Sequence, residues 1–88
     1  MSSLELIALL RLRLRQIEGL DVTTPFGQHS LQARLTSLPE ELSAYSAADG
    51  ISQRMQELAT RQLPAQELQL RLSRLLVAAL IQLPPLLG

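Results

Sequence analysis

The chain contains no cysteine, no tryptophan and no lysine, and it has one histidine among its 88 residues. The absence of cysteine excludes disulfide bonds and thiolate metal ligands, which commonly stabilise domains of this size. A single histidine also excludes a histidine-rich metal site. We therefore expect no cofactor and no metal, and we expect oligomerisation or a partner chain to supply the missing stability.

Residues that favour β-strands are scarce, whereas leucine makes up a quarter of the chain. Leucine occurs 22 times, and Phe26 and Tyr45 are the only aromatic residues. Leucine and alanine are strong helix formers, while aromatic and β-branched residues favour strands. The composition predicts an all-α fold, namely a small bundle of four to five helices that forms one domain over residues 1–88.

Charge and hydropathy limit the classes of partner. The formal net charge is zero, which argues against binding to nucleic acid or to an anionic membrane surface. The longest apolar run, 75–87, includes Gln82 and two prolines and is shorter than the roughly 20 residues of a spanning helix. Glu5 and Arg11 interrupt the start of the chain, unlike a secretory signal. We expect a cytoplasmic protein without a membrane span, and no small-molecule ligand is indicated.

Glycine and proline predict the boundaries in the first third of the chain. Gly19 predicts the end of a helix over 4–18, because glycine takes the left-handed conformation that often follows a last helical turn. Residues 21–27 then form a connector, in which Thr24-Pro25-Phe26-Gly27 has the proline and glycine placement of a type I turn. We expect Phe26 to pack onto the end of the bundle.

Two helices are expected in the middle of the chain, separated by proline. The first is a short helix over about 28–37. The second begins at Pro39, because proline fits the first position of a helix. It carries Leu42 and Tyr45 and ends near Asp49-Gly50, which the sequence leaves open as a turn or a kink.

The last helix is apolar on nearly every side. After a helix over 51–62, Pro64 begins a final helix over 64–83, the longest of the chain. Within 75–83 only Gln82 is polar, whereas a surface helix hides an apolar stripe of about 100°. Either this helix is central and wrapped by the others, or it lies in a dimeric or heteromeric interface. We favour the interface, and we disfavour an in-plane membrane anchor because a basic belt is missing.

No arrangement of residues predicts catalysis. His29 and Ser30 are the only neighbouring base and nucleophile worth considering. Adjacent residues of a helix point about 100° apart, so these two side chains do not form the hydrogen bond that a nucleophile needs. We therefore expect that the protein is not an enzyme.

Protein–protein interaction is the favoured function. We expect a small helical adaptor, chaperone-like protein or accessory subunit that buries an apolar helix face against a partner chain, with arginines at the rim. In size and composition the chain is similar to small helical chaperones and accessory subunits of bacterial secretion machines. The predicted partner interface combines the last helix with the first and consists of Leu68, Leu72, Leu75, Leu76, Ala79, Leu80, Leu83, Leu6 and Leu10.

Two alternatives stay open at this point. In the first, the same surface serves only to hold a structural homo-oligomer together. In the second, the chain is a small nucleic-acid-binding regulator that uses Arg11, Arg13 and Arg15, because clustered positive charge is what phosphate contacts require. The favoured partner is another protein chain, either a second copy or a different protein.

Overall fold

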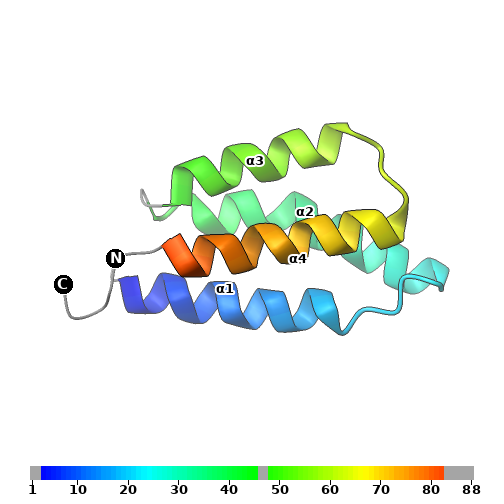
Figure 1. The fold of residues 1–88 in the computed structure, drawn as a ribbon, viewed down its shortest axis with the longest axis horizontal. Helices are drawn as coiled ribbons and strands as arrows, with labels where there is room; N and C mark the ends of the chain where they lie inside the picture. Colours follow the sequence, from blue (N-terminus) through cyan, green and yellow to red (C-terminus); the bar gives the residue numbers. More distant parts are fainter. Residues whose placement is uncertain (1–2, 46–47, 83–88) are drawn as a thin grey trace.

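The computed structural model describes residues 3–45 and 48–82, and within these ranges it contains four α-helices and no β-strand. The helices are α1 (Ser3–Glu18), α2 (Pro25–Leu42), α3 (Asp49–Thr60) and α4 (Ala65–Gln82). Each helix runs antiparallel to the one before it (Figure 1). The most extensive packing is between α1 and α4 and between α2 and α3. The predicted all-α helical bundle is confirmed.

Leucines at helical spacing form the core. All four helices contribute buried apolar side chains, and no polar or charged side chain of the described residues is buried. Each fully buried leucine contributes about 1.5–3 kcal/mol through removal of apolar surface from water. The most completely buried side chains are Leu6, Leu10, Ile17, Leu31, Leu35, Leu38, Leu42, Met55, Leu72 and Leu76.

Two polar contacts fix α1 to its neighbours. Arg13 donates from Nε to Glu41 Oε2 of α2 at 3.1 Å and from a second guanidinium nitrogen to the same oxygen. The Gln69 amide of α4 donates to the backbone oxygens of Ile17 and Leu20, at 2.8 and 2.9 Å. These carbonyls lie in the last turn of α1 and just beyond it, where the donors of a following turn are missing; Ile17 O also accepts from the Leu20 backbone N–H at 3.2 Å. A side chain of α4 therefore caps α1.

Pro39 lies inside α2, and the predicted break before it is wrong. The structure has one helix over Pro25–Leu42 in place of the expected helix over 28–37 and a restart at Pro39. Proline in a helix interior costs about 3 kcal/mol. Leu38 and Leu42 are fully buried, and their burial contributes about 3–6 kcal/mol together. Continuing the helix keeps both leucines on the stripe that faces the core.

Asp49 and Gly50 begin a helix, which corrects their predicted place at the end of one. The helix that was expected to run to this point ends at Leu42, and Tyr45 packs against the core in the connector that follows. Asp49 lies in the first turn of α3, where its negative charge complements the positive end of the helix dipole. The aspartate and glycine are therefore neither a turn nor a kink.

Thr24 caps the N-terminus of α2, which replaces the predicted type I turn. The Thr24 hydroxyl accepts a hydrogen bond from the Gly27 backbone N–H at 3.0 Å. Pro25 takes the first helical position, where its missing N–H costs nothing. The expected packing of Phe26 onto the bundle is also wrong, because its side chain is 80% exposed. The helix that begins at Pro25 directs it outward.

Helices α2 and α4 each have 18 residues, and Leu83, where the last helix was expected to end, lies outside the described residues. Helix α4 also packs against α2 and α3, in addition to α1. None of the helices in the described part of the chain has the length and apolarity needed to cross a membrane.

Candidate interaction surface

Most of the predicted interface residues lie inside the single chain. Leu75 and Leu80 are partly buried, and Leu83 lies outside the described residues. A side chain that is buried within its own chain offers no surface to a partner while the bundle stays closed. The buried members of the predicted set are Leu6, Leu10, Leu68, Leu72, Leu76 and Ala79.

The side of α4 that faces away from the core keeps a row of exposed apolar side chains. Leu70 is 50% exposed, Val77 42% and Ile81 78%. Their spacings of seven and four residues place them along one face of the helix. We call this row the open α4 face. The bundle therefore does not wrap α4 on all sides, as a fully central helix would require.

Helix α1 carries a second exposed apolar row. Leu4 and Leu12 are half or more exposed, and Ala8 between them is also exposed. The spacing of four residues places the three on one side of α1. Because α1 and α4 are antiparallel neighbours (Figure 1), the first turns of α1 lie beside the last turns of α4. Leu4 and Ile81, at 60% and 78% exposure, therefore lie at the same end of the bundle.

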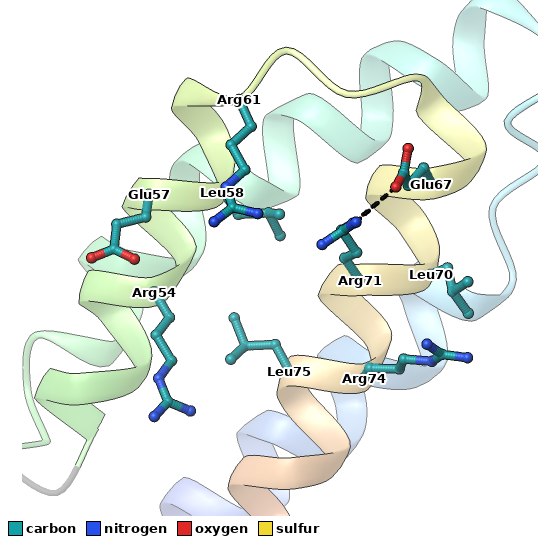
Figure 2. Close-up of a pocket in the computed structure, with 9 residues that line it drawn as sticks. All are labelled: Arg54, Glu57, Leu58, Arg61, Glu67, Leu70, Arg71, Arg74 and Leu75. Atoms are coloured by element: carbon teal, nitrogen blue, oxygen red, sulfur yellow. Dashed lines mark hydrogen bonds and ion pairs between the residues drawn. The ribbon is translucent and has the colours of Figure 1, made fainter.

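A groove with a volume of about 620 Å³ runs between α3 and α4. Leu58 of α3 and Leu75 of α4 point into it from opposite sides, with Arg54 of α3 and Arg61, at the C-cap of α3, beside them (Figure 2). We call it the α3–α4 groove. Its lining residues are Arg54, Glu57, Leu58, Arg61, Glu67, Leu70, Arg71, Arg74 and Leu75. Leu75 is the only predicted interface residue in this set.

Positive charge exceeds negative charge around the α3–α4 groove. Four arginines and two glutamates line it. Arg71 pairs with Glu67 at 2.8 Å on the surface of α4, with both side chains about half exposed. Within the described residues, Arg54, Arg61 and Arg74 form no ion pair. The groove therefore combines an aliphatic floor with guanidinium groups that are free to receive carboxylates.

The three arginines of α1 are not presented together. Arg11 and Arg15 are exposed. Arg13 is turned toward α2, where it contacts Glu41, and it also donates to Gln16 Oε1 at 2.8 Å. An arginine that is neutralised by its own chain contributes little to phosphate binding. This arrangement weakens the argument for nucleic-acid binding through α1.

The sequence pattern contained a signal for part of this surface. Leu70, Val77 and Ile81 fall on the side of the last helix opposite its main leucine stripe, so helical spacing already separated them from the core. The α3–α4 groove had no such signal, because it depends on how two helices pack. No protein-family model matches the chain, and no curated protein or solved structure matches it.

Proposed function

We propose that this chain is a protein–protein interaction module, a small helical adaptor, chaperone-like or accessory subunit that works in an oligomeric complex. The observation that supports the proposal is the open α4 face, where Leu70, Val77 and Ile81 remain exposed after the core is complete. The partner covers this face and the neighbouring exposed row of α1. One side of α4 thus packs in the core, and the other side contacts the partner.

The free energies of burial and association favour an interaction surface that includes both α1 and α4. If a partner covers the exposed parts of the open α4 face, the burial would contribute on the order of 3–4 kcal/mol to the free energy of binding. Association costs at least about 4 kcal/mol in lost rotational and translational freedom. The α4 face alone is therefore insufficient. Leu4 and Leu12 of α1 are comparably exposed, and their burial brings the total above that minimum cost of association.

Site-specific photo-cross-linking in the cells that make the protein tests the proposal. A photoreactive residue is placed at Val77 or Ile81, and at Gln32 or Thr36 of α2 as matched controls, which are exposed and polar. The expected result is a discrete cross-linked product with a different protein from the α4 positions and none from the α2 positions. Products that do not depend on position, or no product at all, would overturn the proposal.

The same experiment distinguishes the purely structural homo-oligomer. Self-association alone gives a cross-linked product of twice the chain mass from Val77 and Ile81. Sedimentation of the purified protein over a range of concentrations then gives a dimer. A monomer in sedimentation, combined with a cross-link to another protein in cells, supports the adaptor.

A further inference from the structure

We propose that the α3–α4 groove binds an acidic amphipathic helix of a partner protein. This inference rests on the proposed function and deepens it, since it names the chemistry of the partner and a second contact surface. The groove shares Leu70 with the open α4 face, whereas Val77 and Ile81 of that face are not among its lining residues. The two surfaces can therefore be tested separately.

The floor of the groove fits aliphatic side chains. Leu58 and Leu75 line it from the two helices (Figure 2). Leu58 is only 8% exposed and belongs to the core, so Leu75, which its own chain covers only partly, supplies more of the apolar surface open to an occupant. Helix-in-groove recognition uses apolar side chains at spacings of three and four residues along the bound helix. A cavity volume of about 620 Å³ lies within the range of roughly 300–1,000 Å³ typical of binding pockets.

The rim of the groove selects negative charge. Arg54 and Arg61 have no carboxylate partner in the described residues. Glu57, the nearest acidic residue of α3, points away from α4 (Figure 2). Guanidinium groups bind carboxylates bidentately, and carboxylates on both flanks of an apolar stripe would meet them.

The spacing of the arginines sets the length of the occupant. Arg54 of α3 and Arg61, which directly follows the last residue of α3 and keeps helical dihedral angles, are seven residues apart, which is about 10 Å along a helix, or two turns. A bound helix of two to three turns therefore spans the rim. Its glutamates or aspartates would be separated by about two turns to reach both arginines.

Other occupants match the groove less well. Single-stranded nucleic acid gains much of its affinity from stacking on aromatic side chains, and no aromatic residue lines the groove. A second copy of this chain would present the exposed row of α1, which is flanked by Arg11 and Arg15. Those arginines would repel the arginines of the rim. An acidic apolar helix satisfies both the floor and the rim.

The test uses the full chain and a synthetic peptide of about four helical turns, with leucines along one stripe and glutamates on both flanks. A matched peptide carries glutamine in place of every glutamate. The expected result is saturable binding of the acidic peptide, with shifts of the Leu58 and Leu75 methyl signals in NMR spectra. Binding of the glutamine peptide is expected to be at least about fivefold weaker.

Two double variants localise the binding. Arg54→Gln with Arg61→Gln should weaken binding of the acidic peptide about five- to tenfold, and Arg11→Gln with Arg15→Gln should change it less than about twofold. All four arginines are exposed, and both variants remove the same charge, so circular dichroism should show folded protein in each case. Equal weakening by the two variants, or methyl shifts away from the groove, would overturn the inference.

Two outcomes separate this inference from the proposed function. No peptide binding, together with cross-links from Val77 and Ile81, overturns the groove inference and leaves the proposed function standing. Peptide binding without those cross-links supports the groove and overturns the assignment of the open α4 face. Tighter binding of a single-stranded oligonucleotide than of the acidic peptide overturns the choice of a protein partner for the groove.

Discussion

Replacing Gly27 with alanine should destabilise the protein, although alanine is the better helix former. Gly27 is buried in the first turn of α2, and a Cβ there would lie 1.8 Å from the backbone oxygen of Asp21. Non-bonded heavy atoms pack at about 3.5 Å, so the connector would have to move by well over 1 Å.

The connector is held by hydrogen bonds that such a movement would break. The Thr24 hydroxyl donates to Asp21 O at 2.9 Å, and the Gly27 N–H donates to that hydroxyl at 3.0 Å. The Gln28 amide donates to Val22 O at 3.0 Å. Each of the two or three hydrogen bonds lost lowers the free energy of unfolding by about 0.5–1.5 kcal/mol. The higher helix propensity of alanine raises it by about 1 kcal/mol. We expect a net loss of about 2 kcal/mol.

Gly50→Ala is the matched control. Gly50 lies in the first turn of α3, and among the described residues no atom other than those of its chain neighbours and of its own helix backbone lies within 4 Å of the position its Cβ would take. Alanine there should stabilise the protein by about 0.5–1 kcal/mol. Thermal and urea unfolding followed by circular dichroism measure both variants, and Gly27→Ala should lower Tm by about 8–16 °C. If Gly27→Ala were as stable as Gly50→Ala, the close approach of Asp21 to α2 would be refuted.

Three further predictions concern single contacts. Glu41→Gln removes the charged partner of Arg13 between α1 and α2. It should lower the free energy of unfolding, measured by urea titration, by about 1–2 kcal/mol, and a loss below about 0.3 kcal/mol would contradict this. Gln62 has a φ of 53°, so Gln62→Gly should raise Tm by a few degrees, since glycine adopts this conformation at lower cost, and a fall in Tm would argue against it. The Thr23 hydroxyl and backbone N–H hold the pKa of Asp21 below its ordinary value of 3.8, so Thr23→Ala should raise that pKa in an NMR titration. The stability that Asp21 contributes is present above pH 3.8 and is lost as the pH falls through the lowered pKa, and an unchanged pKa in Thr23→Ala would refute the assigned cause.

The helix ends that local chemistry determines were predicted closely. The helix over 4–18 corresponds to Ser3–Glu18, and the helix over 64–83 corresponds to Ala65–Gln82, because Pro64 precedes it. Gly19 does follow the first helix, but the left-handed conformation expected there is wrong, because no described glycine has a positive φ. The helix through Pro39 was missed for the opposite reason. Its continuation depends on burial of leucines on both sides of the proline, and burial is a tertiary effect that outweighs the local preference.

The exposed surface was only partly predictable. Leucine stripes identify the side of each helix that faces inward, and most of the residues assigned to a partner interface lie on those stripes and in the core. A pattern of this kind does not distinguish cover by the same chain from cover by another. The α3–α4 groove needs two helices placed side by side with Leu58 opposite Leu75, and no spacing within either helix encodes that distance.

Because Gln69 caps α1, helix α4 could be supplied as a separate peptide and would bind the rest of the bundle in one defined register. The exposed connector after α3 is a natural place to divide the chain, and the fragment before it would lack both the α4 leucines and the amide that satisfies the carbonyls of Ile17 and Leu20. A peptide that supplies α4 in trans would restore both at once, because shifting it by one turn would carry Gln69 away from those carbonyls. The bundle is therefore suited to fragment complementation, with reassembly reported by the ordering of the last turn of α1.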